Sequence, residues 1–505
     1  MKKVISRIGT AAILALVLMC SSKSSYALDR SYTYNYDYWG DVQNTPDFYS
    51  PAKVFTSTEL NLDKRLLSPQ GIYVYNDSVY IMDTGNNRII ELKRTSKESL
   101  VVERIIESFN GDIDNKKFSG PTDMAISEAG NYFIADKGNG RILKLDKDLN
   151  FLMTFDIPKD SSIGDDVSFQ PSKIVVDTAE RVYCVAVGIN KGLVKYEADG
   201  TFAGFVGATP VVFDFKQYIW KKFATQEQLT QMESFVPTEY DNAYIDYEGF
   251  IYACTANVKE EDLKAGKTDP VRKLNLLGND ILVRNGVFYK GDFPVYGDIY
   301  MGSGGGYSGP SLLTDITCFD NDVYTVLDKN RGRLFSYDDQ GRLMFVCGGA
   351  GNMDGYFRNP IGLDHMGYDL FVLDQLDCSI TVFTLTEFGE LVYTAMKQFN
   401  KGEYKQSGET WQKVIEADGN YDLAYIGVGR ALLREKKYKE AMDYFELKYD
   451  DENYSKAYKQ YRKVWVEEHI VIIVIVILAL FLVPMTIGKI KSLKFQIASS
   501  DAFKF

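Results

Sequence analysis

The chain has 505 residues, enough for roughly two to four domains. Hydrophobic residues make up 45% and charged residues 25%, so a mostly disordered chain is excluded. Only two histidines occur, His365 and His469, which excludes a zinc site built on three histidines. The first 27 residues carry a charge of +4 and the last 18 carry +3, which leaves −19 for residues 28–487. A surface this acidic repels phosphate backbones, so we expect no nucleic-acid partner.

The N-terminus has the layout of a secretory signal peptide. A basic start precedes the apolar run Ala11–Met19, and the small residues Ser25 and Ala27 stand at the −3 and −1 positions of a cleavage site. We predict a signal peptide over residues 1–27. Lipid attachment at Cys20 is the alternative, although Met19 stands where lipoprotein signals usually have Gly, Ala or Ser.

Residues 61–390 contain a repeat with a period of about 50 residues. Each unit begins at a proline, continues as an alternating strand and a second strand that ends in aspartate, and closes with a glycine-rich turn and a third strand. The units begin at Pro69, Pro121, Pro171, Pro310 and Pro360, with an enlarged unit near Pro237. In the third unit Val187 stands in place of the aspartate, and the enlarged unit is distorted by an insertion at 257–272.

The physics of such a unit predicts a propeller. Alternation with a period of two gives each strand one buried face, and turns of Gly, Asn and Asp suit tight hairpins. No single unit could bury its faces alone, so we expect the units to stack and to close in a ring that protects the sheet edges. We predict an all-β, six-bladed propeller. Within the N-terminal segment 28–60, the aromatic-rich stretch Ser31–Phe55 is a candidate for the strand that closes the last blade.

Two motifs resemble those of the NHL family of β-propellers. The D-x-x-N-x-R-[IL] signature is found as DTGNNRI from Asp83 and as DKGNGRI from Asp136. The linker pattern of the family is found as GNMDGYFRNPIGLD in residues 351–364. The resemblance implies the propeller fold and leaves the function open.

Few residues of the propeller point to chemistry. We expect the four strand-end aspartates to bond turn amides, with metal binding as the alternative; they are Asp83, Asp136, Asp328 and Asp374. We expect His365 to be a structural turn histidine, since amidating lyases, which are related propellers, hold zinc through several histidines. We therefore predict no catalytic, cofactor-binding or metal-ligating residue.

Three further features accompany the repeats. Asp214–Phe235 has apolar residues at helical spacing and is predicted to be a helical insertion, either packed on the propeller or used for interaction. Gly302–Gly309 lacks the ending of a phosphate-binding loop and is expected to be a flexible connection. Five cysteines remain after Cys20, without a CxxC pair, and we expect buried free thiols.

After the propeller the apolar period becomes helical. Three positions recur 34 residues later: Tyr404, Ser407 and Trp411 return as Tyr438, Ala441 and Phe445. This period, with small and aromatic residues at these places, resembles tetratricopeptide repeats, and we predict such helices over residues 391–466. A plain amphipathic stalk is the alternative.

The run Ile470–Ile487 contains 18 residues without a charge. At about 1.5 Å per residue it spans about 27 Å, enough for the core of a bilayer. Glutamates precede it and lysines follow it, so the positive-inside rule places the C-terminus in the cytoplasm. We predict a transmembrane helix over residues 469–487, a basic cytoplasmic tail over 488–505, and a large ectodomain outside the cell.

Two functions suit this plan. The first is a membrane-anchored extracytoplasmic binding or scaffold protein, which assembles a cell-surface protein complex such as a transporter. The second is a metal-dependent hydrolase of the gluconolactonase kind, with a calcium-like ion in the propeller channel. We expect the first, with protein partners, a membrane anchor and no cofactor.

Overall fold

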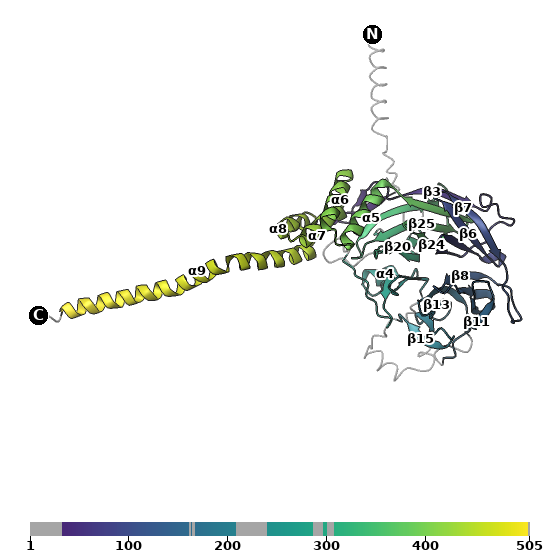
Figure 1. The fold of residues 1–505 in the computed structure, drawn as a ribbon, viewed down its shortest axis with the longest axis horizontal. Coiled ribbons are helices and arrows are strands. Elements are labelled where there is room, and N and C mark those ends of the chain that lie inside the picture. Colours follow the sequence, from purple (N-terminus) through teal and green to yellow (C-terminus); the bar gives the residue numbers. More distant parts are fainter. Residues whose placement is uncertain are drawn as a thin grey trace, which may run out of the picture. The chain divides into compact units, whose positions relative to one another are not determined.

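The computed structural model describes residues 33–160, 163, 167–208, 240–285, 296–299 and 308–502. The chain divides into two compact units, residues 1–384 and 385–505 (Figure 1). The predicted signal peptide, the predicted insertion at 214–235 and most of the glycine-rich run at 302–309 lie outside the described residues.

The first unit is a β-propeller, as the repeat predicts. Five sheets have four or more strands, and another has three among the described residues. The first three sheets are β4 (Gly71–Tyr75), β5 (Ser78–Asp83), β6 (Arg88–Ser96) and β7 (Ser99–Ile106); β8 (Pro121–Ile126), β9 (Tyr132–Asp136), β10 (Arg141–Leu145) and β11 (Phe151–Phe155); and β12 (Pro171–Val176), β13 (Val182–Ala186), β14 (Leu193–Tyr196) and β15 (Phe202–Val206).

The remaining sheets follow the same plan with additions. They are β16 (Asn242–Ile245), β17 (Ile251–Cys254) and β18 (Val271–Leu274); β19 (Leu313–Cys318), β20 (Tyr324–Asp328), β21 (Arg333–Tyr337) and β22 (Leu343–Ala350); and β24 (Pro360–Met366), β25 (Asp369–Asp374), β26 (Ser379–Leu385) and β3 (Tyr49–Thr56). Short strands β1 (Tyr34–Tyr36), β2 (Val42–Asn44) and β23 (Tyr356–Phe357) extend the sheet of β19–β22.

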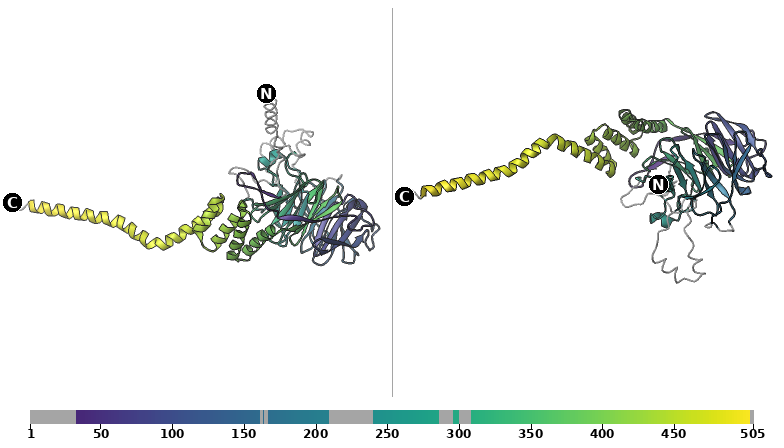
Figure 2. Two further views of the ribbon diagram at one scale, coloured as in Figure 1. Left: turned by 90° about the horizontal axis from the view of Figure 1, so that it is seen from above. Right: turned by 60° about the horizontal axis from the view of Figure 1, so that its bottom comes forward.

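The first strands of the sheets form a closed ring. Strands β4, β8, β12, β16, β19 and β24 contact one another in this order, and β24 contacts β4 in turn; Figure 2 gives two further views of this unit. Apolar side chains fill the spaces between neighbouring sheets, and one such cluster joins Met82 and Ile89 to Ile134. The propeller thus has five complete blades, with the three-stranded sheet β16–β18 in the ring between two of them.

The N-terminal segment supplies a strand to the last sheet. Strand β3 lies beside β26, and Phe55 on β3, 2% exposed, shares an apolar cluster with Leu373 and Ile380. The Tyr49 hydroxyl donates a hydrogen bond to the carbonyl oxygen of Tyr368 at 2.8 Å. The two ends of the propeller sequence therefore share one blade, which leaves no unpaired junction between them.

Strand register corrects two details of the predicted repeat. Pro121 pairs with Asp136, and in the third sheet Pro171 pairs with Ala186. Ala186, and not Val187, therefore occupies the position of the aspartate. The predicted insertion at 257–272 contains helix α4 (Glu260–Lys264) and the beginning of β18, so part of it belongs to a sheet.

The second unit is a series of helices that pack in chain order. They are α5 (Glu387–Asn400), α6 (Tyr404–Ala417), α7 (Asp422–Arg434), α8 (Tyr438–Leu447) and α9 (Asp451–Ala502). The side chain of Thr386 caps α5 by accepting from the Gly389 amide at 3.3 Å, so this helix begins before the predicted boundary at 391. Helix α9 continues without a break through the predicted membrane segment and most of the tail.

Two glycines of α7 let aromatic side chains approach its backbone. A Cβ on Gly427 would lie 2.4 Å from the ring of Trp411 on α6. A Cβ on Gly429 would lie 2.6 Å from the ring of Phe445 on α8. Both rings are buried, so α7 is packed on two sides. This packing is that of a folded helical array; its identification as tetratricopeptide repeats stays a prediction.

We predict that Gly429→Ala destabilises the helical unit by about 1–3 kcal/mol, because the new methyl group overlaps the buried Phe445 ring. Gly408→Ala on α6 is the matched control, since its Cβ would meet only Ala431 Cβ at an ordinary 3.5 Å. The control should gain about 0.5–1 kcal/mol from helix propensity alone. Urea unfolding of the full-length protein in detergent, followed by circular dichroism at the helix minimum, measures both. Equal midpoints for the two variants would contradict the packing.

Candidate functional site

The inner strands enclose a cavity of about 130 Å³ on the axis of the ring. All six inner strands contribute to its wall, and its polar side chains are Tyr73, Asp123, Lys173, Asn242, Tyr244, Asp315 and Asp364. A buried water needs roughly 10–15 Å³, so the cavity has room for several waters or for a ligand of a few heavy atoms.

Strand register sorts the wall into two layers. The lysine layer consists of the inner-strand residues Gly71, Asp123, Lys173, Asn242, Asp315 and Gly362, which pair at equivalent positions of the second strands. Two residues further along each strand lies the tyrosine layer, which consists of Tyr73, Ala125, Val175, Tyr244, Thr317 and Asp364. Side chains two apart on a strand share one face, so the layers follow one another along the axis.

Carboxylates of both layers link neighbouring inner strands. Each accepts a hydrogen bond from a backbone amide of the next strand in the ring: Asp123 from Ile174 at 2.8 Å, Asp315 from Leu363 at 2.7 Å and Asp364 from Val74 at 2.6 Å. Asn242 adds a fourth link by donating from Nδ2 to Asp315. These bonds satisfy amides that have no strand neighbour on the inner side of the ring.

The glycines of the lysine layer allow a closer approach of the strands. A Cβ on Gly71 would lie 2.3 Å from the carbonyl oxygen of Thr122 on β8. A Cβ on Gly362 would lie 2.9 Å from Ile72 Cγ2 on β4. At these two junctions no side chain fits between the inner strands, so the ring narrows there.

Burial favours the neutral form of the layer carboxyls. Burial raises the pKa of Asp364 to about 7, although the backbone amides of Val74 and His365 act in the opposite direction by stabilising the anion. It raises the pKa of Asp315 to about 6, against the opposing charge of Lys173. Burial also raises the pKa of Asp123, again opposed by Lys173.

Lys173 breaks the pattern of links. It occupies on β12 the position that Asp123 and Asp315 occupy on their strands, but an ammonium cannot accept from an amide. Within the described part of the chain, this ammonium makes no hydrogen bond or ion pair. Burial would lower the pKa of Lys173, yet the nearby carboxylates of Asp123 and Asp315 outweigh it and raise that pKa. The cavity therefore contains a charged ammonium without a direct partner.

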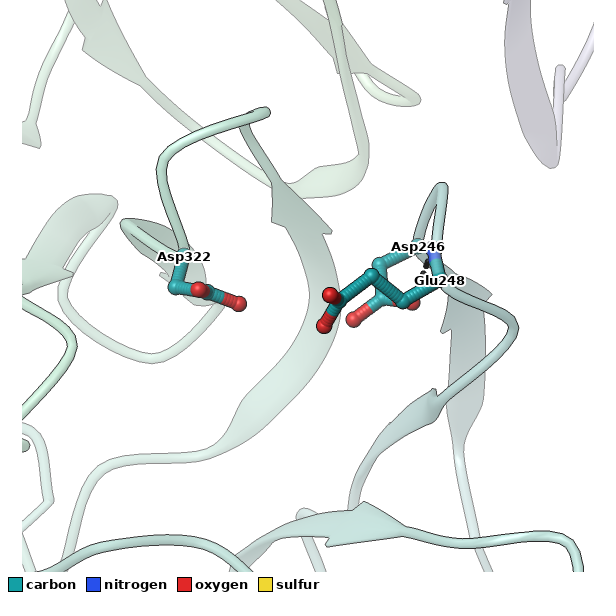
Figure 3. A group of neighbouring side chains, drawn as sticks. All are labelled: Asp246, Glu248 and Asp322. Carbon is teal, nitrogen blue, oxygen red and sulfur yellow. Dashed lines mark hydrogen bonds between the residues drawn. The ribbon is translucent and has the colours of Figure 1, made fainter. Parts of the chain in front are cut away.

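A separate acidic cluster lies at the hairpins β16–β17 and β19–β20. Figure 3 shows its members, Asp246, Glu248 and Asp322, each of which places a carboxylate oxygen within 4.8 Å of the others. The ammonium of Lys273 on β18 lies 2.9 Å from Asp322 Oδ1 and 3.4 Å from Asp246 Oδ2. The Lys273 ammonium thus pairs with two of the three carboxylates, and these ion pairs would have to rearrange before the cluster could hold a divalent ion.

Lys273 belongs to a repeated structural device. Third-strand lysines lie over second-strand aromatic rings at equivalent register, with Nζ-to-centroid distances of 5.4 Å for Lys144–Phe133, 5.8 Å for Lys195–Tyr183 and 5.0 Å for Lys273–Tyr252. Lys144 then reaches Glu180 of the next sheet at 2.6 Å, as Lys273 reaches Asp322. Ion pairs of this kind tie neighbouring sheets together.

The strand-end aspartates bind backbone amides. Each carboxylate accepts a hydrogen bond from a backbone amide in the segment before the first strand of its sheet, sixteen or seventeen residues earlier. The pairs are Asp83 with Leu67, Asp136 with Ser119, Asp328 with Leu312 and Asp374 with Arg358. Asp328 and Asp374 also accept from turn amides, as predicted. The Asn and Arg of the D-x-x-N-x-R signature donate to the same aspartates. Asn86 and Arg88 Nε donate to Asp83 at 2.8 and 2.7 Å, and Asn139 and Arg141 Nε donate to Asp136 at 2.8 and 2.9 Å.

His365 lies in strand β24 and not in a turn, which corrects the prediction. Its Nδ1 is 2.6 Å from the Thr317 hydroxyl, and its ring packs edge-on against Phe319 at 4.7 Å. Burial lowers the pKa of His365 to about 4, so the imidazole is neutral at physiological pH. It is a packed side chain beside the cavity wall.

The cysteines of the described chain are free thiols. Cys184, Cys254, Cys318 and Cys347 are buried, and Cys378 is partly buried. Burial raises the pKa of Cys318 to about 12, which makes the thiolate inaccessible at neutral pH. Cys20 lies outside the described residues.

The cavity residues were not predicted from the sequence. Asp123, Lys173, Asp315 and Asp364 stand in the first strand of their units, as in TDMAI, SKIVV, TDITC and GLDHM. A charged residue inside an otherwise apolar strand is the signal that could have identified them.

No protein-family model matches the chain, and no curated protein matches it. Among solved structures, the catalytically inactive virginiamycin B lyase from Staphylococcus aureus with quinupristin is similar with a TM-score of 0.39 and 10% identity, over 64% of this chain and 83% of that chain. A streptogramin B lyase has a TM-score of 0.38 and 13% identity, over 67% and 98%. BamB from Moraxella catarrhalis has a TM-score of 0.30 and 12% identity, over 62% and 71%. Similarities at this level carry no argument about function, and membership of the NHL family stays a prediction.

We predict that Asp364→Asn destabilises the protein more at pH 5 than at pH 8. A carboxyl whose pKa is raised on folding binds its proton preferentially in the folded state, so its contribution to stability is present at low pH and is lost as pH rises through about 7. At about 1.4 kcal/mol per pKa unit, the wild-type advantage should grow by roughly 2–3 kcal/mol between pH 8 and pH 5. His365, with its lowered pKa, has the opposite dependence and cancels in the difference. Urea unfolding of the wild type and of Asp364→Asn at the two pH values measures the difference in their free energies of unfolding. The same difference at pH 5 and at pH 8 would contradict the raised pKa.

Proposed function

We propose that this protein is a membrane-anchored extracytoplasmic binding protein that assembles a cell-surface protein complex. In this proposal the three-stranded sheet counts as the incomplete sixth blade of an NHL-like propeller. The helical unit is a tetratricopeptide-like array that connects the propeller to one transmembrane helix.

The apolar segment of α9 is the observation that carries the proposal. None of its side chains is buried in the described structure, and Val471 and Phe481 are 66% and 75% exposed. Exposing some 18 apolar residues to water is strongly unfavourable, whereas a bilayer removes them from water and the helix satisfies its own backbone. Single-pass anchoring is therefore the placement that best suits this helix.

The charges on either side of the segment support one orientation. Glu467 and Glu468 precede it, and Lys489, Lys491 and Lys494 follow it. Lysines are retained on the cytoplasmic side and interact there with anionic lipids. Together with the predicted signal peptide, these charges support our proposal that the propeller and the helices α5–α8 lie outside the cell.

We propose binding and not catalysis because the carboxylates of the propeller already have structural partners. The strand-end aspartates accept linker amides, and the cavity carboxylates accept inner-strand amides. A divalent ion in the channel, as a gluconolactonase-like hydrolase needs, would lie beside the Lys173 ammonium and meet like charge. These residues do not fit such an ion, so we derive no hydrolytic step.

A protein partner is the class of ligand that this arrangement suits. Loops of all sheets gather on the two ends of a propeller, and helical arrays present long surfaces to proteins. The charge of −19 over residues 28–487 disfavours nucleic acid and favours a partner with basic surface regions. A transporter complex at the cell surface is the assembly that we propose.

We predict that ending the chain after Val466 converts it from a membrane protein to a secreted one, because the apolar segment is its anchor. Ending the chain after Ile487 is the matched control, since it removes only the basic tail and keeps the segment. Alkaline extraction of membranes and immunoblotting of the culture medium measure the two variants. Release of both variants, or retention of both, would contradict the anchor.

We further predict that cross-linking in native membranes joins the full-length protein to integral membrane proteins, identified by mass spectrometry. The variant that ends after Val466 should give these cross-links at least about tenfold less often, because anchoring concentrates the partners in one plane. A full-length protein that cross-links only to itself would overturn the scaffold proposal.

A further inference from the structure

The cavity of the ring is lined by the ammonium of Lys173 and by the carboxyls of Asp123, Asp315 and Asp364. With six inner strands in the ring, β12 lies across the axis from β24, so Lys173 stands across from the strand of Asp364. Lys173 belongs to the lysine layer and Asp364 to the tyrosine layer. The two side chains therefore lie at different depths along the axis as well as on opposite sides of it. No ion pair joins them among the described residues. The cavity separates a positive from a negative group and leaves room between them.

The tyrosine layer adds two aromatic rings to the wall of the cavity. Strands β4 and β16 also lie across from each other, which places Tyr73 and Tyr244 on either side of the cavity. Burial, and in addition the Asp364 carboxylate, raises the pKa of both tyrosines, so the three groups share one electrostatic environment. A cavity lined by a carboxylate and by two aromatic rings is a favourable environment for an ammonium group.

The lysine layer offers the complementary environment for an anionic group. The Lys173 ammonium has three donors and no acceptor among the described residues. Asp123 and Asp315 each link their strand to the next one by accepting from a backbone amide. Lys173 cannot accept such a hydrogen bond, so it makes no link of this kind between β12 and β16. A charged side chain that makes no link between strands, beside a polar cavity, is where a functional site is expected.

Charge balance selects the class of ligand. An anion alone would pair with Lys173 but would leave the Asp364 carboxyl across the cavity without a counter-charge, and a cation alone would meet Lys173. A molecule with one group of each sign pairs both walls and adds no net charge to a buried site. The volume of about 130 Å³ limits this molecule to a few heavy atoms.

We propose that the propeller cavity binds a small zwitterion of the α-amino-acid type, with its carboxylate at Lys173 and its ammonium among Tyr73, Tyr244 and Asp364. This site is independent of the protein partner, so it goes beyond the proposed function. Ligand binding would also link β12 to the strands across the ring and would stabilise the junction that lacks a side-chain link.

The test is calorimetric titration of the full-length protein in detergent with glycine, L-alanine and L-serine. Acetate and methylammonium, which carry one charge each, are the comparison ligands. At least one amino acid should bind with a Kd of about 10 mM or tighter, and both comparison ligands should bind at least about tenfold more weakly. Lys173→Met, which keeps the length of the side chain, should weaken amino-acid binding by at least about tenfold.

Lys195→Met is the matched control, because Lys195 lies on β14 of the same blade, over the Tyr183 ring, and does not line the cavity. It should leave amino-acid binding unchanged. Lys173→Gln repeats the measurement should Lys173→Met fail to fold. The proposal is overturned if no amino acid binds to the wild type, if acetate binds as well as the amino acids, or if the folded Lys173 variant retains wild-type affinity. None of these outcomes bears on the cross-linking result.

Discussion

The structure depends on how the inner strands of the propeller are joined. Neighbouring sheets share no strand ladder, so each inner strand has one edge whose amides lack partners. The carboxylates of Asp123, Asp315 and Asp364 reach across this gap and accept from amides of the next strand. An unpaired buried amide is costly, and so is an unpaired buried carboxylate, so each link resolves two problems at once. Apolar packing between the sheets can then complete a ring that has no open edge.

Many aspartates of the propeller have structural partners within the protein. Strand-end aspartates hold the linkers, layer aspartates hold the inner strands, and Asp246 and Asp322 hold Lys273. Each carboxylate has a protein donor of its own. Lys173 differs because no residue in the described part of the chain pairs directly with its ammonium, although carboxylates lie nearby. The unusual residue of the site is therefore its cation.

Much of the architecture could be predicted because it depends on local periodicity. Alternating strands at a spacing of about 50 residues predicted a propeller, and a long uncharged run predicted the apolar C-terminal helix; both are confirmed. Details that depend on the pairing of the strands could not be predicted from the sequence. Ala186 and Val187 lie next to each other in one apolar strand, and only the pairing with Pro171 shows which of them takes the aspartate position. His365 looked like a turn residue because Gly367 follows it closely, yet β24 extends to Met366.

The cavity could not be predicted for a physical reason. Its residues come from strands about 50 residues apart in sequence, and a charged side chain in an apolar strand can face a neighbouring sheet, the axis or solvent. Asp123 and Lys173 stand at equivalent positions, but one links strands and the other does not. This difference depends on the geometry of the closed ring, which no single unit contains.

The position of β3 has a consequence for the order of folding. The strand is made before the other strands of the last sheet, because its partner β26 lies near the C-terminal end of the propeller, and the Tyr49–Tyr368 contact spans 319 residues of sequence. During synthesis from the N-terminus, β3 must therefore wait while every other blade forms. Until then the growing propeller is an open arc with two exposed ends, each able to pair with another chain. The closing of a long loop makes this the slow step of folding.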